Sequence, residues 1–247
     1  MLLLTTAALP QLDQHRHMNL GRLITPRHRC RLADTLEAGY PVAADNDCFQ
    51  GLDATSVCAM LEAIAPWPSV GARIRRAWPW ARAGVSWSFV GGGVRREAIV
   101  TDERLPPPHP NLLWIAVPDV VGDADATLEQ FRAWHMWVCH LPLAFVLQDG
   151  AERPGRVPWD APGLAGVFVG RSTGWKLGPD AAGLVREARR RGLHAHMGRV
   201  STARRIRYAQ SIGCTSFDSS RYSRWRELLL DDGLIRAGQP PQLRLLP

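Results

Sequence analysis

Short apolar runs recur along the chain, and each is followed by a turn signal and then by a longer helical pattern. Residues 124–140, 179–191 and 202–211 have apolar side chains at helical spacing. This alternation predicts repeated βα units, and eight of them would form a (β/α)8 TIM-type barrel. The expected strands are residues 112–118, 143–147, 166–169, 194–197 and 214–217, with weaker candidates at 41–44, 2–6 and 20–25.

One stretch, residues 66–110, interrupts this rhythm with tryptophans, a run of three glycines and a run of three prolines. We interpret it as an insertion after the third strand. Within it, residues 85–90 alternate in polarity and predict one arm of a small hairpin. The length of 247 residues fits one barrel, so we expect a single domain spanning residues 1–247.

The chain is basic, with a formal net charge of +7, and Lys176 is its only lysine. A basic surface favours polyanions such as nucleic acid, although the same charge is also typical of a merely solvated surface. The five cysteines are scattered and form no C-x-x-C pair, which indicates a reduced, intracellular protein without zinc. No apolar run predicts a membrane span or an export signal, so we expect a cytoplasmic protein.

Polar or glycine residues stand directly after six of the expected strands. In a parallel barrel the carboxyl ends of the strands open onto one face, so these residues are expected to converge on one pocket. Each alone is also explained as a helix cap or a turn residue. Several carboxylates aimed into one cavity repel each other, however, and this favours a functional site. The residues are Asp45, Asp119, Gln148, Gly170, Gly198 and Asp218.

The same segments carry motifs that resemble a known family. Residues 44–50 (ADNDCFQ) are similar to its Asp-Ser-Gly-Gly-Phe/Tyr-Gln loop, and residues 146–150 (VLQDG) to its Val-Gln-Gly segment. Residues 166–170 (GVFVG) resemble Gly-Leu-Ala-Val-Gly, residues 196–202 (HMGRVST) resemble Leu-Met-Gly-Val-Gly-Thr, and Ser216-Phe217-Asp218 resembles Met-Phe-Asp. The family is that of the tRNA-guanine transglycosylases (queuine tRNA-ribosyltransferases). The chain looks most like the short phage and bacterial enzymes that place 7-deazaguanines into DNA.

This resemblance implies a base exchange in which Asp218 is the nucleophile and Asp45 the acid/base group. Asp119, within residues 117–119 (VPD), would read N1 and N2 of guanine. Gln148 or a backbone N–H near Gly166 would donate a hydrogen bond to O6 of the guanine. Phe49 and Met197 would sandwich the base, although an aromatic residue and a methionine near strand ends are also common in a core. The remaining base-binding positions implied are Gly170 and Gly198.

The chain departs from the tRNA enzymes at several positions. It has no Cys or His after Asp218, so we expect no zinc subdomain, no metal and no cofactor. The family's Leu-Pro-Thr-Arg is replaced by residues 219–225 (SSRYSRW), which favours DNA over tRNA as the partner. Arg171 stands where the tRNA enzymes have a Glu, which favours a neutral 7-substituent. Asp47 and Cys48 replace two glycines, which predicts a reshaped loop.

Three readings remain open on these residues. The first is a DNA guanine transglycosylase that inserts a 7-deazaguanine base. The second is the same exchange on tRNA. The third is a catalytically silent barrel that binds nucleic acid, in which the carboxylates are only caps. The oligomeric state is not indicated by the pattern.

Overall fold

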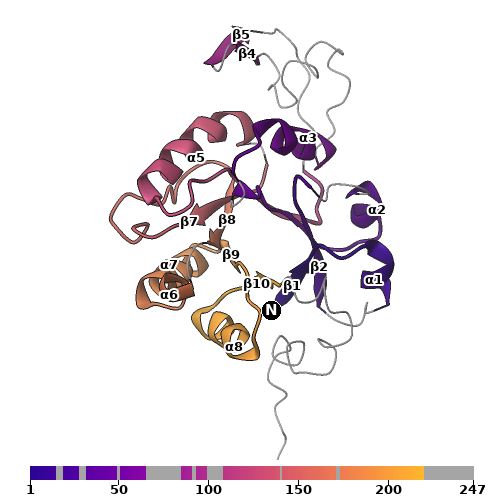
Figure 1. The fold of residues 1–247 in the computed structure, drawn as a ribbon, viewed down its shortest axis with the longest axis vertical. Helices are drawn as coiled ribbons and strands as arrows, with labels where there is room; N and C mark the ends of the chain where they lie inside the picture. Colours follow the sequence, from indigo (N-terminus) through magenta and orange to yellow (C-terminus); the bar gives the residue numbers. More distant parts are fainter. Residues whose placement is uncertain are drawn as a thin grey trace, which may run out of the picture.

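The fold is a closed barrel of eight parallel strands surrounded by helices (Figure 1). The computed structural model describes residues 1–14, 19–27, 32–48, 51–64, 85–90, 93–98, 108–139, 141–170 and 173–219. Strand β1 pairs with both β2 and β10, which closes the sheet. The predicted TIM-type barrel is therefore confirmed at the level of fold class. The barrel strands are β1 (Leu2–Thr5), β2 (Leu20–Ile24), β3 (Val42–Ala44), β6 (Leu112–Ala116), β7 (Leu143–Leu147), β8 (Leu164–Val169), β9 (His194–Met197) and β10 (Ser216–Asp218).

The helices lie around the outside of the barrel (Figure 1). The three predicted helices are confirmed as α5, α7 and α8, with ends that differ by one or two residues from the expected ones. Asp123 caps α5, and α8 ends at Gly213, which has a φ of 102°. The described helices are α1 (Leu9–Asp13), α2 (Leu32–Glu37), α3 (Ala54–Ile64), α5 (Ala124–Val138), α6 (Thr173–Lys176), α7 (Pro179–Arg190) and α8 (Ala203–Ile212).

One connection departs from the expected βα rhythm. Residues 148–163, between β7 and β8, form turns instead of a helix. Three prolines in this segment each lack a backbone N–H, and glycines 150, 155 and 163 have positive φ values. This composition interrupts helical hydrogen bonding, so the segment crosses between the strands as a loop.

The apolar residues form two separate layers. The larger layer lies between the strands and the helices, and includes Phe131, Phe145 and Ile206. The smaller layer fills the barrel interior and is formed by Leu2, Leu4, Leu23, Ala43, Trp114, Ala116, Ala144, Val146 and Phe168. Successive side chains of a strand point to opposite faces. A residue two positions beyond an interior residue therefore points into the barrel mouth.

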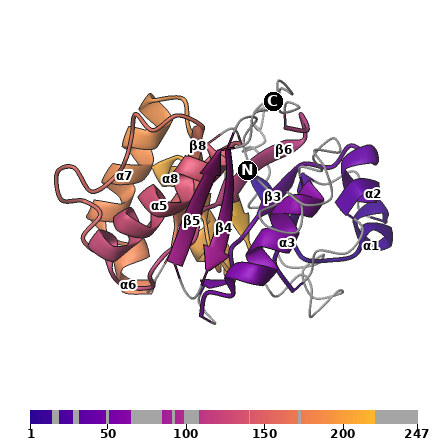
Figure 2. The same ribbon diagram turned by 90° about the horizontal axis from the view of Figure 1, so that it is seen from above.

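Between α3 and β6 the chain forms a second, two-stranded sheet. Its strands are β4 (Val85–Val90) and β5 (Gly93–Ala98), which pair antiparallel. Figure 2 shows the two strands running side by side. The hairpin arm predicted at residues 85–90 is thus confirmed. Most of the stretch 66–107 outside these strands lies beyond the described residues. None of the helices described is long and apolar enough to cross a membrane.

Candidate active site

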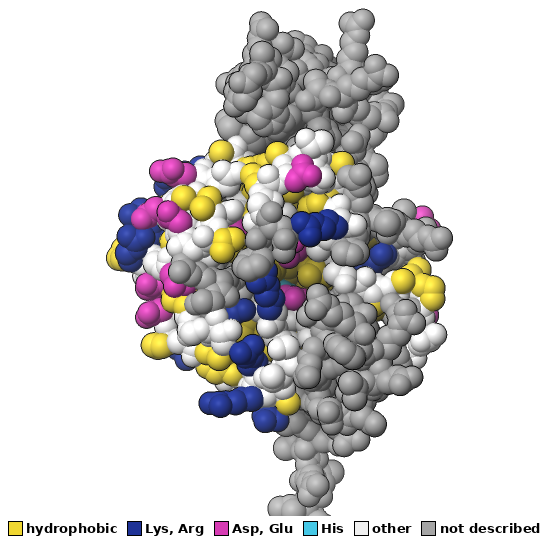
Figure 3. Space-filling model, in the orientation of Figure 1, with side chains coloured by type: hydrophobic (Ala, Val, Ile, Leu, Met, Phe, Trp, Pro, Cys, Tyr) yellow, Lys and Arg dark blue, Asp and Glu magenta, His cyan; other side chains and the backbone are white. Residues whose placement is uncertain are grey.

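Residues that follow six different strands line one pocket at the carboxyl end of the barrel. Among them are Asp45, Asp119, Gln148, Gly170, Gly198 and Asp218. Asp45, Gln148 and Asp218 lie two positions beyond Ala43, Val146 and Ser216, so strand alternation turns their side chains inward. In Figure 3, acidic and basic side chains border a hollow near the middle of the face. The structure therefore brings together the strand-end residues singled out from the sequence.

Asp119 is held by two side-chain amides. Asn46 Nδ2 donates to Oδ1 at 2.8 Å, and Gln148 Nε2 donates to Oδ2 at 2.6 Å. Each amide is itself anchored, because Asn46 also donates to the carbonyl of Val117 and Gln148 Oε1 accepts from the backbone N–H of Gly122. Burial raises the pKa of Asp119, and the two amide hydrogen bonds oppose that rise. The carboxylate is thus fixed in orientation, and each oxygen keeps a lone pair for a ligand.

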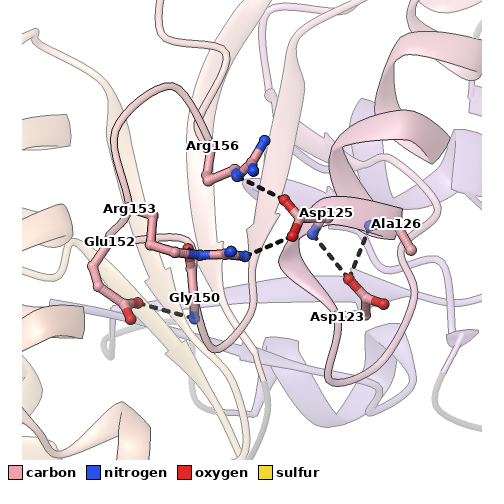
Figure 4. Close-up of polar contacts among 7 residues, drawn as sticks. All are labelled: Asp123, Asp125, Ala126, Gly150, Glu152, Arg153 and Arg156. Carbon is pink, nitrogen blue, oxygen red and sulfur yellow. Dashed lines mark hydrogen bonds and ion pairs between the residues drawn. The ribbon is translucent and has the colours of Figure 1, made fainter.

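The loops that carry this clamp are tied to each other at the rim. Arg153 and Arg156, in the loop after β7, form ion pairs with Asp125 in the first turn of α5, at 2.7 and 2.6 Å (Figure 4). The hydrogen bond from Arg153 is the main cause that keeps the pKa of Asp125 below its usual value. Gly150 N–H donates to Glu152 in the same loop. Asp119 and Gln148 therefore lie on loops with a preset geometry.

Asp45 differs from an ordinary exposed carboxyl. Burial, followed by the negative charge of Asp218, raises its pKa to about 7, and a hydrogen bond from the backbone N–H of Asp47 opposes the rise. A group with this pKa exchanges its proton near neutral pH. Asp45 is thus suited to act first as an acid and then as a base.

Asp218 lies in a set of donors. Its Oδ1 accepts from His196 Nε2 and from the backbone N–H of Arg199, both at 3.0 Å. Its carbonyl accepts from the backbone N–H of Val200 at 2.8 Å. A Cβ on Gly198 would lie 2.9 Å from the ring of Phe168 and 3.4 Å from Asp218 Oδ1. A side chain at this position would therefore clash with the Phe168 ring beside the carboxylate.

Two histidines below Asp218 were not predicted from the sequence. His196 Nδ1 and His194 Nε2 each lie 2.7 Å from Ser216 Oγ. His196 and Ser216 are both fully buried, and the His196 ring packs against Trp114 and Phe168. Burial lowers the pKa of His196, and it lowers the pKa of His194 to about 3. Both rings are therefore neutral at physiological pH. A usable signal was present, since residues 194 and 196 share the strand phase of Gly198.

Lys176 was also missed. This single lysine ends the short helix α6 and lines the pocket, where its Nζ donates to the carbonyl of Gly198 at 2.7 Å. Burial lowers its pKa to about 8, although the charge of Asp218 opposes the shift. The ammonium group thus contributes positive charge close to Asp218 and supports the backbone of Gly198. No pattern in the sequence pointed to it beyond its uniqueness.

Backbone strain is concentrated at this pocket. Asp47 and Arg199, with φ values of 56° and 57°, are the two non-glycine residues in the left-handed region within the described part of the chain, and both line the pocket. Aspartate tolerates this conformation better than most residues. The loop after β3 therefore keeps a left-handed turn at Asp47 without glycine there, and an ion pair with Arg27 at 3.1 Å supports it.

Cys48 lines the same pocket but does not compete as a nucleophile. Burial raises the pKa of its thiol to about 12. The thiol is protonated at neutral pH, whereas nucleophilic attack requires the thiolate. Its backbone N–H donates to Asn46 Oδ1, so the residue serves the clamp on Asp119.

Two of the expected base-binding residues, Gly166 and Met197, do not lie at the pocket wall. Gly166 lies in the first half of β8 against His194, where a Cβ would come within 2.9 Å of the His194 carbonyl. Met197 is 1% exposed and packs in the outer layer between strands and helices. Its strand neighbour His196 takes the inward position instead. Phe49 lies outside the described residues, as does Arg171.

The chain matches no model of a known protein family, and a search of curated proteins likewise finds no match. Within the described ranges, no group of three or more His, Cys, Asp or Glu side chains is placed to hold a metal ion.

Proposed function

We propose that the protein is a transglycosylase that exchanges guanine in DNA for a 7-deazaguanine derivative through a covalent glycosyl-aspartate. The observation that carries this proposal is the pairing of two unlike carboxyl groups in one pocket. Asp45 has its pKa raised to about 7, whereas Asp218 accepts two hydrogen bonds on Oδ1. Retaining exchange at a sugar carbon requires one carboxylate that attacks and one group that moves a proton.

In the first displacement, Asp218 Oδ2 attacks C1′ of the target nucleotide. The electron pair of the C1′–N9 bond passes to the purine, and the carboxyl proton of Asp45 neutralises the departing base. The products are free guanine and a sugar ester on Asp218. Both donors given above bind Oδ1, so Oδ2 is the oxygen assigned to the new bond.

In the second displacement, the incoming base reverses these transfers. The Asp45 carboxylate removes the N9 proton of the 7-deazaguanine, and N9 attacks C1′. The electron pair of the ester bond returns to Asp218. Two inversions at C1′ restore the original configuration. One acid/base group thus serves both steps without any cofactor.

Asp119 is the residue that we assign to the guanine edge. Its two oxygens are each held by one amide, at 2.8 and 2.6 Å, and each retains acceptor capacity for N1–H and N2–H of the base. The second N–H of the Gln148 amide is available for O6. Guanine and a 7-deazaguanine share this edge, so the same residues can read both the departing and the incoming base.

The surroundings of the pocket favour a polynucleotide over a free nucleoside. The chain carries a net charge of +7, and Lys176 and Arg199 both line the pocket. Phosphates of a bound strand would be attracted by such cations. The exposed large apolar side chains within the described part all stand on loops after β3, β6 and β8, where unstacked bases would lie; they are Leu52, Val120, Val121 and Leu177.

Two further parts of the chain enter the proposal from sequence alone. We assign residues 66–110 as an insertion that contacts nucleic acid beside the pocket, because seven arginines fall within it. Residues 219–225 (SSRYSRW) differ from the corresponding motif of the tRNA enzymes, which favours DNA. A duplex hides its glycosidic bonds, so the target guanine must be flipped out or lie in a single strand. Such an enzyme would act in the cytoplasm of a bacterium or of a phage-infected host.

The test is release of labelled guanine from DNA when a 7-deazaguanine base is supplied. We expect release with the wild-type protein and none above background with Asp218→Asn, which cannot form the ester efficiently. Single-stranded DNA, duplex DNA and tRNA are compared at one salt concentration, because binding to each falls with salt.

Each outcome of this test decides something. Release from tRNA but not from DNA would show that tRNA is the substrate, as it is for the tRNA enzymes. Salt-sensitive binding without release from any polymer would overturn the proposal in favour of a silent binding barrel. Full exchange by the Asp218→Asn variant would show that Asp218 is not the nucleophile.

A further inference from the structure

A continuous chain of hydrogen bonds runs through the barrel interior and ends on Asp218. His194 Nε2 meets Ser216 Oγ at 2.7 Å, Ser216 Oγ meets His196 Nδ1 at 2.7 Å, and His196 Nε2 meets Asp218 Oδ1 at 3.0 Å. These side chains come from the two adjacent strands β9 and β10, whose backbones pair at Ser216 and His196.

The direction of this chain follows from its acceptor end. An ionised carboxylate can only accept, so Nε2 of His196 carries the proton that it shares with Asp218. A neutral imidazole then has a bare Nδ1, which accepts from the hydroxyl of Ser216. The hydroxyl oxygen in turn accepts from Nε2–H of His194. All three hydrogen bonds are thus donated in the same direction along the chain, from His194 toward Asp218.

These polar groups lie at buried positions where an unpaired polar group would destabilise the fold. His196 and Ser216 are fully buried, and burying imidazole and hydroxyl groups without partners destabilises a fold. The corresponding interior positions of β1, β2 and β3 are Leu2, Leu4, Leu23 and Ala43, which need no partners. Apolar side chains could therefore also fill the interior beneath Asp218. What His196 and Ser216 provide in their place is the hydrogen bond to Asp218.

We propose that His196 is a positioning residue for the nucleophile: its fixed tautomer holds Oδ1 of Asp218 and thereby presents Oδ2 to the sugar carbon. The acceptor Asp218 sets that tautomer, and Ser216 and His194 support the ring from its other side. This inference rests on the proposed function, because it assigns a role within the same exchange. It adds residues that neither the strand-end pattern nor the family motifs marked, since the family motif has leucine at the place of His196.

The donor on Oδ1 has a kinetic consequence. A hydrogen bond donated to a carboxylate stabilises its charge, so it makes Asp218 a better leaving group in the second displacement. Without it, the C1′–Oδ2 ester bond is broken more slowly because the returning negative charge has one donor fewer. Loss of His196 should therefore slow turnover and raise the fraction of enzyme trapped as the sugar ester.

The kinetic test uses His196→Leu, which removes the donor, and His196→Gln, which can return an N–H near the position of Nε2. We expect about a 10- to 100-fold fall in steady-state exchange for the leucine variant. We also expect a larger burst of guanine release relative to turnover, and recovery to within about tenfold of wild type for the glutamine variant. The control is His135→Gln, a histidine on α5 that contacts Pro162 and lies outside the pocket. Thermal unfolding of every variant reports whether it is folded.

A second measurement does not depend on activity. In ¹⁵N NMR spectra of the wild type, the ring nitrogens of His196 should show the Nε2–H tautomer. Ser216→Ala should keep this tautomer, because Asp218 still accepts from Nε2–H, but it should shift the Nδ1 resonance because the hydrogen bond to Nδ1 is lost. A wild-type ring protonated on Nδ1 would overturn the inference, whatever the substrate is.

The outcomes separate the inference from the function on which it rests. Exchange that is lost in Asp218→Asn but unchanged in His196→Leu would contradict the positioning role and leave the function intact. Equal loss in the leucine and glutamine variants, with both folded, would also contradict it, because the donor would then not be the relevant property. Absence of exchange in the wild type would refute the function, and the NMR result alone would then show whether the ring holds Asp218 in the stated manner.

Discussion

The two sides of the barrel interior are built differently. Below Asp45, the strands β1, β2 and β3 contribute Leu4, Leu23 and Ala43, which are apolar. Below Asp218, β9 and β10 contribute His196 and Ser216, which are fully buried and hydrogen-bonded. The side chains named beneath Asp45 are hydrocarbon, whereas those beneath Asp218 include a hydrogen-bond donor to its carboxylate. One barrel thus creates two unlike environments a short distance apart.

This difference divides the chemistry between the two carboxyl groups. Burial and the charge of Asp218 raise the pKa of Asp45 to about 7, so Asp45 can hold a proton where an exposed aspartate would not. Asp218 accepts hydrogen bonds from His196 and from the backbone of Arg199. In the proposed mechanism, this asymmetry of the interior is the physical basis for one proton carrier and one nucleophile.

Among variants that keep Asp218, the largest effect is expected from removing the proton carrier. Asp45→Asn should lower guanine release by about 10²- to 10⁴-fold, the usual contribution of a general acid or base. In the wild type, the first displacement needs protonated Asp45, so single-turnover release should fall as pH rises through about 7. The residual rate of Asp45→Asn should lack this dependence. A wild-type profile that is flat between about pH 6 and 9 would contradict the role.

The next effect comes from crowding Phe168, whose ring packs against His196 beneath the nucleophile. A methyl group at Gly198 would press on Phe168 and approach Asp218 Oδ1 at 3.4 Å. Gly198→Ala should therefore reduce exchange by up to about 100-fold, since small displacements of a reacting group have effects of this size. Gly183→Ala is the matched control, because a Cβ there meets no atom within 4 Å and its helix should gain stability. Full activity of Gly198→Ala would show that the position of Asp218 is not critical.

A smaller effect is expected on stability. The folded state binds the Asp45 proton more tightly than the unfolded chain, so wild-type stability declines as pH rises from about 4 to about 7. Asp45→Asn removes that decline. The variant should be more stable than the wild type at about pH 8.5, by about 1–2 kcal/mol, roughly half of the full shift because the carboxyl group is partly exposed. Urea unfolding at about pH 4.5 and 8.5 measures the difference. An equal difference at both pH values would contradict the raised pKa.

The smallest effect concerns the reading of the base. Asn46→Ala removes one of the two amides that hold Asp119, while Gln148 keeps the other. The KM for the incoming base should rise by about tenfold, with a much smaller change in kcat, because in the proposed mechanism Asp119 contacts the base and not the sugar carbon. A fall in kcat alone would place Asp119 in the chemical step instead.

Much of the barrel could be predicted from the sequence because strand and helix periodicities differ. The same periodicity explains which pocket residues were found, since Asp45, Gln148 and Asp218 are each in phase with an interior residue. The loop between β7 and β8 was less predictable. Its prolines indicate that a long helix is interrupted, but they do not show whether a short helix forms between them.

The supporting residues could be recognised only once the strands were paired. His196 reaches Asp218 across two strands, 22 residues apart in the chain. Lys176 reaches Gly198 from a short helix after β8, a contact that also spans 22 residues. Met197 looked like a base contact because it lies near a strand end, yet the inward phase belongs to its neighbour. The alternation of side chains within a strand is therefore a better guide to which residues line the pocket than distance from the end of the strand.

The central claim is that Asp218 carries the sugar during exchange. The most direct measurement is to mix the protein with guanine-containing DNA in the absence of an incoming base, quench with acid, digest, and map the adduct by mass spectrometry. We expect the DNA sugar to be attached to the peptide that contains Asp218, and Asp218→Asn to yield no adduct. Base exchange with no adduct, or an adduct on Asp45 instead, would contradict it.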